Sequence, residues 1–316
     1  MRNLGRTDMQ VTPLCLGGNV FGWTADEADS FKVLDAYVDG EGNFIDTADV
    51  YSTWVVGHDG GESEKVLGDW MHKRGNRAHV IIATKVGSPM PEKGHGLSRR
   101  YIMHAVEDSL RRLRTDYIDL YQAHRDDLET PQEETLATFA DLIHQGKVRA
   151  IGASNFTAQR LESANKISER EGYPRYECLQ PAYNLVHRKE YEAELEPLCR
   201  KQQIGVISYS SLASGFLTGK YRKGAALPPT PRAQGVQSKY WNDKSFALLE
   251  QLDRAATIHG ATPGQVALAW LIARPGITAP IASATSVEQA RELMGALKLQ
   301  LDQETIETLN QVSNGL

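Results

Sequence analysis

The 316-residue sequence contains few cysteines and no long apolar run. Its three cysteines are odd in number and form no Cys-x-x-Cys pair, which argues against a disulfide framework and for a reducing compartment. No apolar stretch reaches the roughly 20 residues that span a bilayer, and residues 1–6 lack the apolar core of a signal peptide. We therefore expect a cytoplasmic protein without a membrane partner.

Charge and motif content exclude further classes. The net charge is −5 at pH 7 and no run of Lys and Arg resembles a nucleic-acid footprint, so we expect no nucleic-acid partner. The histidines show no ligand spacing such as His-x-x-x-His, so no metal site is predicted. A Gly-x-Gly-x-x-Gly loop is missing after the early strands, which weakens a doubly wound dinucleotide-binding sheet as the architecture. The oligomeric state is left open.

Short apolar runs alternate with amphipathic segments along the chain. The runs have the length of strands and are centred on Cys15, Phe44, Ile81, Ile118, Ala150, Leu179, Val206 and Ile281. The segments between them have helical patterns, over residues 25–38, 62–73, 98–113, 131–145, 157–169, 189–202 and 244–259. Eight strand–helix units predict a (β/α)8 TIM barrel that occupies residues 1–316 as one α/β domain.

Two segments fall outside this repeat. Residues 1–14 contain two short apolar stretches around a polar Gly5-Arg6-Thr7-Asp8 turn, which predicts an N-terminal β-hairpin. The connection between strands seven and eight, 209–278, is far longer than the others and holds an extra helical pattern at 265–273 and a Pro/Gly-rich stretch at 224–232. Because long loops in compact domains are usually functional, we predict an extended lid after strand 7.

Several of the apolar runs stop at a residue that can do chemistry. Asp46, Lys85 and His124 end the second, third and fourth strands, and Tyr51 follows Asp46 by five positions. Active sites of TIM barrels lie at the carboxyl ends of the strands, so these side chains are predicted to share one pocket. Each alone has an ordinary explanation, such as a turn-forming Asp or a solvated Lys. The prediction depends on their occurring together.

These four side chains can polarise a carbonyl group. An isolated tyrosine titrates near pH 10 and is a poor proton donor at neutrality. The ammonium of Lys85 should favour phenolate and lower the pKa of Tyr51, while Asp46 holds that ammonium in place. His124 can orient the carbonyl oxygen and stabilise the charge that develops on it. The set contains no electron source, so a separate reductant is required.

The motifs around these residues form a recognisable series over residues 44–51, 61–68, 83–85, 117–124 and 151–156. With them, the sequence resembles the aldo-keto reductase superfamily over essentially its whole length. The resemblance implies that Asp46, Tyr51, Lys85 and His124 are a catalytic tetrad, with Tyr51 as the general acid in reduction. It also implies a nicotinamide cofactor bound in extended form across the barrel mouth.

Residues 209–221, 228–232 and 283–292 make the second half similar to one branch of this family. That branch contains bacterial general-stress reductases, sugar-phosphate reductases and the β subunits of voltage-gated potassium channels. The similarity implies that Tyr209 stacks on the nicotinamide, that Lys220 and the preceding loop hold the pyrophosphate, and that Arg232 meets the adenosine phosphate. The implied cofactor contacts are Asn19, Asp46, Ser154, Asn155, Gln180, Tyr209, Ser210, Ser211, Leu212, Ser214, Lys220, Arg232, Thr285, Gln289 and Glu292.

The adenosine motif departs from this branch in two places. The branch usually has glycine at the position of Ser283 and asparagine at that of Leu293. No Lys or Arg occurs at 283–286, although the 2′-phosphate of NADPH normally calls for a cation. We expect NADPH as the cofactor, with its selectivity resting on Lys220, Arg232 and Arg291, and NADH as the alternative.

These observations predict an NAD(P)H-dependent reductase of small aldehydes or ketones. Two alternatives stay open: an NAD-dependent sugar or alcohol dehydrogenase, and a cofactor-sensing regulatory subunit that resembles the channel β subunits. His124 favours an enzyme, because the channel subunits carry asparagine there. Trp23 and Trp54 follow the first two strands, and either wall an apolar substrate pocket or pack their own loops. The substrate itself is not predicted.

Overall fold

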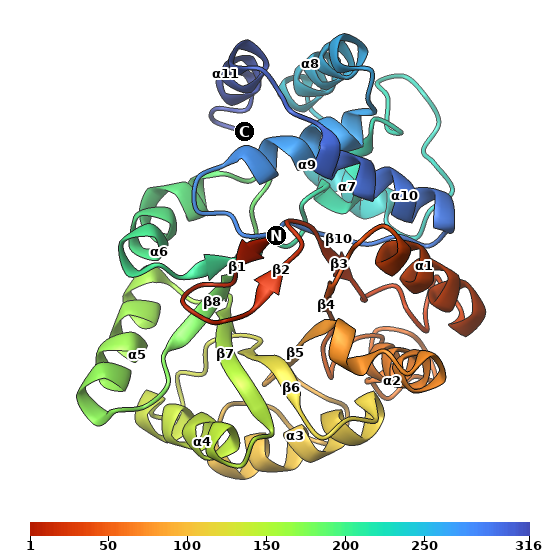
Figure 1. Cartoon of the computed structure of the whole chain (residues 1–316). Helices are drawn as coiled ribbons and strands as arrows, with labels where there is room; N and C mark the ends of the chain where they lie inside the picture. The colour runs from red at the N-terminus through yellow and green to blue at the C-terminus, as the bar shows by residue number, and fades with distance from the viewer.

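The computed structural model describes residues 1–316, and a ring of eight parallel strands stands at its centre (Figure 1). In spatial order the strands are β10 (Ile281–Ala282), β3 (Cys15–Gly17), β4 (Phe44–Asp46), β5 (Ile81–Val86), β6 (Ile118–Ala123), β7 (Val148–Ser154), β8 (Tyr176–Gln180) and β9 (Gly205–Val206). The ring closes on both sides of the β9–β10 contact: Thr278, before β10, donates its N–H to the Val206 carbonyl at 2.8 Å, and Ile281 of β10 donates to the carbonyl of Ser208, just after β9, at 2.8 Å. The predicted TIM barrel is confirmed, and each predicted strand centre lies in its strand.

Helices cover the outside of this ring (Figure 1). They are α1 (Glu27–Asp39), α2 (Glu62–Arg74), α3 (Arg99–Leu113), α4 (Gln132–His144), α5 (Ala158–Glu171), α6 (Glu196–Gln202), α7 (Ala233–Tyr240), α8 (Asp243–His259), α9 (Pro263–Ala273), α10 (Val287–Gly295) and α11 (Gln303–Val312), with short helical turns at η1 (Arg77–His79), η2 (Tyr191–Leu195), η3 (Ala213–Thr218) and η4 (Ala296–Lys298). The predicted helices are all present. The sequence patterns did not predict α7, α10 and α11. Helix α8 lies outside the ring of strands and packs against α9 and α11.

The N-terminal hairpin is present and closes the amino end of the barrel. Its strands β1 (Arg2–Asn3) and β2 (Gln10–Val11) pair antiparallel, and Figure 1 shows them crossing the centre of the ring. Buried Leu4 and Met9 of the hairpin belong to one apolar cluster with inward-facing strand residues such as Cys15 and Phe44. Because this end of the barrel is plugged, a ligand has access only from the carboxyl ends of the strands.

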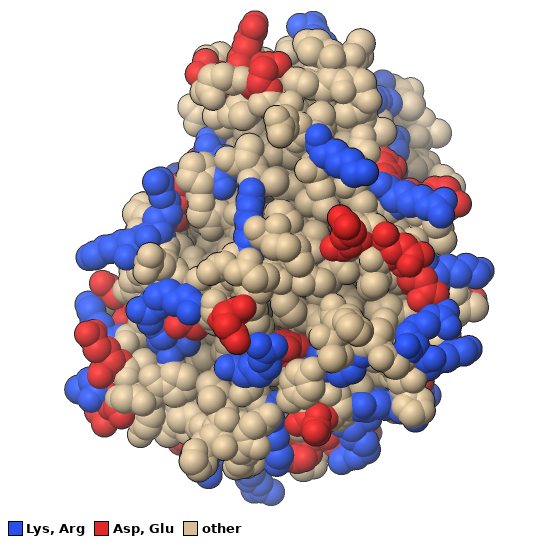
Figure 2. Space-filling view, viewed as in Figure 1, with Lys and Arg blue, Asp and Glu red and all other residues tan.

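The face that carries the hairpin has mixed charge. Figure 2 shows basic and acidic side chains interspersed over it, with no field of a single sign. Some of them are paired, as in the contacts of Arg6 with Glu177 and of Arg149 with Asp8. None of the helices combines the length and the hydropathy that a membrane crossing requires.

A buried carboxylate lies in the segment between β4 and α2. Asp49 is 2% exposed, and its Oδ1 has no hydrogen-bond partner. Glu64, also buried, is paired with Arg112 at 2.7 Å. Burial raises the pKa of Asp49 to about 8; repulsion from Glu64 adds to this shift and the charge of Arg112 opposes it. Asp49 is therefore mostly protonated in the folded protein at neutral pH.

This protonation predicts how Asp49→Asn changes stability with pH. An unfolded chain loses the Asp proton near pH 4, whereas the folded protein keeps it up to about pH 8. Between these values the folded state binds the extra proton, so stability falls as pH rises, by at most about 1.4 kcal/mol per pH unit. The variant lacks this loss. Its free energy of unfolding, measured in urea, should therefore increase relative to that of the parent protein as the pH rises from about 5 to 8.

Asp39→Asn is the control, because it removes an exposed carboxylate at the end of α1. Its free energy of unfolding should stay parallel to that of the parent protein over the same pH range. If the Asp49 variant also stayed parallel, a protonated Asp49 would be excluded.

Candidate active site

A cavity of about 1150 Å³ lies at the carboxyl ends of the strands. Of the tetrad and the fifteen implied cofactor contacts, every residue except Lys85 contributes to its lining. Those residues are Asn19, Asp46, Tyr51, His124, Ser154, Asn155, Gln180, Tyr209, Ser210, Ser211, Leu212, Ser214, Lys220, Arg232, Thr285, Gln289 and Glu292. The fold thus brings together positions that span most of the chain. Arg291, by contrast, is exposed and is not among the residues that line the cavity, so its part in cofactor selectivity stays a prediction.

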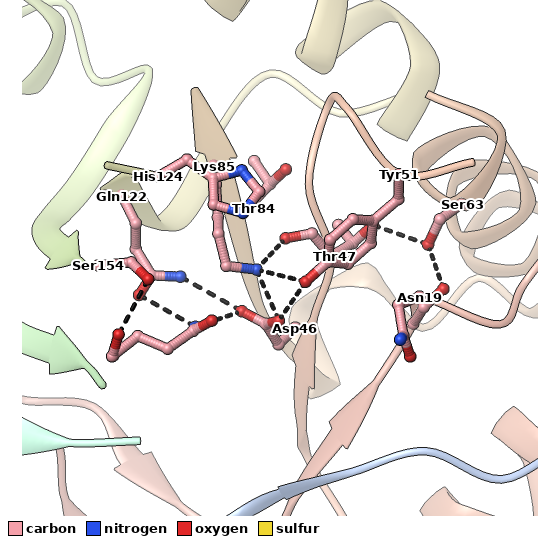
Figure 3. A network of polar contacts seen from close by, with 12 residues as sticks. Asn19, Asp46, Thr47, Tyr51, Ser63, Thr84, Lys85, Gln122, His124 and Ser154 are labelled. Atoms are coloured by element: carbon pink, nitrogen blue, oxygen red, sulfur yellow. Dashed lines mark hydrogen bonds and ion pairs between the residues drawn. The ribbon is translucent and has the colours of Figure 1, made fainter. Parts of the chain in front are cut away.

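Lys85 lies behind the cavity wall and is fully buried. Its Nζ donates to the Asp46 carboxylate at 2.7 Å, to the Thr47 carbonyl at 2.7 Å and to the Tyr51 hydroxyl at 2.9 Å. Figure 3 shows this ammonium, carried on β5, directed toward the segment that follows β4. An ammonium has three donors, so this contact set uses all of them.

The second oxygen of Asp46 is held from the opposite side. Gln180 Nε2 on β8 donates to Asp46 Oδ1 at 2.8 Å, and Gln122 Nε2 on β6 does so at 3.3 Å. Sequence reasoning did not find Gln122. A signal existed, because Gln122 lies two positions before His124, and alternate residues of a strand point to the same face. With both oxygens engaged, the Asp46 carboxylate is fixed in position.

The expectation that Lys85 makes Tyr51 unusually acidic is wrong. Burial raises the pKa of Tyr51 to about 12, and the Lys85 charge lowers it only part of the way while Asp46 raises it. Burial also acts to lower the pKa of Lys85, but Asp46 and Tyr51 together outweigh it and the net shift is upward. At neutral pH the phenol therefore carries its proton and the ammonium its charge.

His124 presents a neutral imidazole beside this phenol. Its ring lies 6.1 Å from that of Tyr51, centroid to centroid, with the planes at 76°. Burial lowers the pKa of His124 well below its usual value, and the charges of Lys85 and Arg125 lower it further. Its Nδ1 is buried and has no hydrogen-bond partner. No group of three His, Cys, Asp or Glu side chains lies close enough together to hold a metal ion.

Asn155 ties the ends of three strands together. Its Nδ2 donates to the His124 carbonyl at 2.9 Å, and its Oδ1 accepts from the Tyr209 hydroxyl at 2.8 Å. Asn155 has a φ of 57°, a left-handed conformation that asparagine tolerates better than most residues. Next to it, Ser154 Oγ donates to the Gln180 carbonyl at 2.9 Å. These contacts arrange polar side chains along one wall of the cavity, and their role toward a nicotinamide stays a prediction.

The loop after β9 and the segment that follows it present serines and two cations to the cavity. Ser210 and Ser214 both line the cavity with positive φ, at 56° and 57°, a conformation that can turn successive N–H groups toward one side. Lys220 and Arg232 also line the cavity and neither takes part in an ion pair or a side-chain hydrogen bond. Burial lowers the pKa of Lys220, and the charge of Arg232 lowers it further. The donor set therefore suits the phosphates of a dinucleotide.

The residues expected at an adenosine group lie around the start of α10. Thr285 donates its N–H to Gln289 Oε1 at 2.9 Å, and Glu292 Oε1 accepts from Thr262 at 2.7 Å. Ser283, where the related branch has glycine, donates to Asn19 Oδ1 at 2.6 Å. A Cβ at Gly17 would lie 2.6 Å from the Ser283 hydroxyl, so a larger residue at the end of β3 would require the Ser283 side chain to move.

An aromatic group stands next to Tyr51. The Trp54 ring lies 6.1 Å from that of Tyr51, and the Trp23 ring lies 5.5 Å from that of Trp54 in an edge-on arrangement. Trp23 lines the cavity, while Trp54 is 50% exposed. The Arg232 guanidinium lies 5.9 Å from the centre of the Trp23 ring, so the long segment after β9 reaches across to the loop after β3. Trp23 therefore serves both as cavity wall and as a loop contact.

Comparison with known proteins shows the family to which the chain belongs. The sequence profile of the Aldo/keto reductase family matches residues 13–314. The chain is 36% identical over 319 residues to the "Uncharacterized oxidoreductase YrpG" of Bacillus subtilis (strain 168), with 99% of this chain and 95% of that protein covered. It is 34% identical to the "Aldo-keto reductase AFTS1" of Alternaria alternata, with 96% and 88% covered.

A third relative is the "Probable voltage-gated potassium channel subunit beta" of Arabidopsis thaliana, at 33% identity with 94% of this chain and 90% of that protein covered. All three matches extend over nearly the whole chain, and so over all the strands that bear the cavity residues. Similarity of this extent, on a barrel with this arrangement of polar side chains, establishes that the chain is an oxidoreductase of the aldo/keto reductase family.

Proposed function

We propose that the protein reduces aldehydes or ketones to alcohols with NADPH as the reductant and Tyr51 as the general acid. The observation that carries this proposal is the contact of the buried Lys85 ammonium with the Tyr51 phenol at 2.9 Å, beside a cavity that His124 also lines. A protonated phenol, a fixed positive charge and a neutral imidazole are the groups that a carbonyl oxygen needs when its carbon is reduced.

Proton transfer from Tyr51 leaves a phenolate, and this is where Lys85 acts. A reduced nicotinamide, when bound, supplies the hydride for the carbonyl carbon. As the carbonyl oxygen gains charge, Tyr51 gives it the phenolic proton, and the ammonium stabilises the phenolate that forms. Asp46 keeps Lys85 charged and in place. With its pKa raised to about 12 by burial, Tyr51 is protonated at neutral pH, and in this proposal the nearby ammonium makes its proton transfer easier by stabilising the phenolate.

His124 would position the carbonyl oxygen. Because its pKa lies well below the usual value, the imidazole stays neutral next to the positive Lys85. A neutral imidazole can donate a hydrogen bond to the substrate oxygen while Tyr51 remains the group that gives up a proton. In the reverse direction the same residues would accept the proton of an alcohol, so the geometry serves oxidation as well.

The cofactor would lie along the polar wall. Ser154, Asn155 and Gln180 would hold its carboxamide, Tyr209 would stack on its ring, and Asn19 would lie beneath it. The loop of Ser210, Ser211, Leu212 and Ser214 with Lys220 would hold the pyrophosphate, and Thr285, Gln289 and Glu292 the adenosine. NADPH is favoured over NADH because Lys220 and Arg232 are two cations without a carboxylate partner at this site.

Tyr51→Phe tests the general acid. The variant keeps the ring but has no proton to donate, so kcat for aldehyde reduction should fall by about 10²- to 10⁴-fold. The Kd for NADPH, measured by nicotinamide fluorescence, should stay within about threefold of the parent value, because the cofactor contacts remain. Tyr240→Phe is the matched control, since Tyr240 lies on α7 away from the cavity and its hydroxyl makes no hydrogen bond. Near-parental turnover by the Tyr51 variant would exclude its role.

Arg232→Ala tests the choice of cofactor. If the guanidinium meets the 2′-phosphate, the Kd for NADPH should rise by about 10-fold or more while that for NADH changes little, because NADH lacks this phosphate. Lys223→Ala is the control: Lys223 lies on the same segment, but it is paired with Asp243 and does not line the cavity. Equal weakening of both cofactors, or tighter binding of NADH by the parent protein, would contradict the assignment.

A further inference from the structure

Arg125 follows His124 directly and is not used by the mechanism above. It lines the same cavity as Tyr51 and His124, and its side chain is exposed. It takes part in no ion pair, and its guanidinium donates no hydrogen bond within the chain. An arginine has five donors, and at this cavity wall all five of Arg125 are free to bind a ligand.

The carboxylates nearest to it in the sequence are engaged elsewhere. Asp126 accepts two hydrogen bonds from Arg160, at 2.7 and 2.9 Å. Asp127 accepts from the Leu97 N–H and from the Thr130 hydroxyl, both at 2.7 Å. The loop after β6 therefore has two acidic residues directly beside Arg125 in the sequence, but both carboxylates are hydrogen-bonded to other residues.

The cavity offers no acid for Arg125 either. Only two carboxylates line it, Asp46 and Glu292. Asp46 is paired with Lys85 at 2.7 Å, and Glu292 accepts from Thr262 at the α10 side. The positive charge beside His124 is therefore not paired with any carboxylate of the cavity, and it is available to an anionic ligand.

This charge is separate from the cations assigned to the cofactor. Lys220 and Arg232 both belong to the segment after β9, and they lie close enough for the charge of one to lower the pKa of the other. Arg125 belongs to the loop after β6 and adjoins the imidazole that would hold the reacting oxygen. It is therefore placed to bind the substrate, and the aromatic group of Trp23 and Trp54 provides an apolar wall for the rest of that molecule.

We propose that Arg125 binds an anionic group of the substrate, so that the preferred substrates are aldehydes or ketones bearing a carboxylate or a phosphate. This inference rests on the proposed reductase function. A planar guanidinium binds either group with two parallel hydrogen bonds, which would also fix the orientation of the carbonyl toward Tyr51. Arg125 is then a residue that determines specificity, without part in the proton transfer.

Matched substrate pairs test this assignment. The kcat/KM values are measured for succinic semialdehyde against butanal, and for glyceraldehyde 3-phosphate against glyceraldehyde. In Arg125→Met the ratio of the anionic to the neutral substrate should fall by about 10- to 100-fold, and in Arg125→Lys by less, since a charge remains without the paired geometry. The pair with the larger fall shows whether carboxylate or phosphate is the natural group.

Arg254→Met is the matched control. Arg254 is exposed on α8, takes part in no ion pair and does not line the cavity, so its loss changes the net charge by the same amount. Its substrate ratios should equal those of the parent protein. Unchanged ratios in Arg125→Met, or equal falls in the two variants, would overturn the proposal.

A binding measurement keeps the two proposals distinguishable. Titration of benzoate and of benzyl alcohol, followed by the tryptophan fluorescence to which Trp23 and Trp54 contribute, needs no turnover. Benzoate should bind the parent protein more tightly than benzyl alcohol, and Arg125→Met should remove that preference. If no carbonyl compound is reduced but this preference is present, the proposed function fails and the anion site stands. If carbonyl compounds are reduced and the preference is absent, only the anion site fails.

Discussion

The site depends on one buried positive charge, the ammonium of Lys85. Removing an ammonium from water costs several kcal/mol even after the protein relaxes, so it is stable only with close acceptors. Here Asp46, Thr47 and Tyr51 supply all three within 2.9 Å. The parallel register pairs Asp46 with Ala83, which places Lys85 just beyond the end of β4. The segment after β4 must therefore fold back over Lys85, and this brings the phenol of Tyr51 to the cavity.

The same charge connects the site to the closure of the barrel. Asp46 can compensate Lys85 with one oxygen because Gln180 and Gln122 hold the other. These partners come from β8 and β6, and Gln180 is 134 positions away in the chain. A network of this kind is complete only when the ring of strands has formed. Removing the Asp46 carboxylate would leave the buried Lys85 ammonium without its counter-charge, which costs roughly 3–5 kcal/mol. Stability and the proposed function thus share these contacts.

The positions of the polar cavity residues were easier to predict from the sequence than their pKa values. The period of the apolar runs located all eight strands, and their polar ends located the cavity. The resemblance to a family supplied the individual roles. The pKa of Tyr51 was predicted in the wrong direction, because a neighbouring ammonium can be inferred from strand ends whereas the depth of burial cannot. The part expected of Arg291 stays a prediction, because its position in a motif does not show which side of α10 it occupies.

The distribution of charge in the cavity extends this argument to ligands. The whole chain has a net charge of −5, yet the cavity has three cations without an ion-pair partner, Arg125, Lys220 and Arg232. Its two carboxylates, Asp46 and Glu292, are both bound by other groups. A positive cavity in a negative protein draws anions to that one place, since low-dielectric walls strengthen the local field. Because the three cations come from two separate loops, two anionic groups fit the cavity better than one. In our proposals, a phosphorylated cofactor would account for the pair after β9, and a charged substrate for the arginine beside the imidazole.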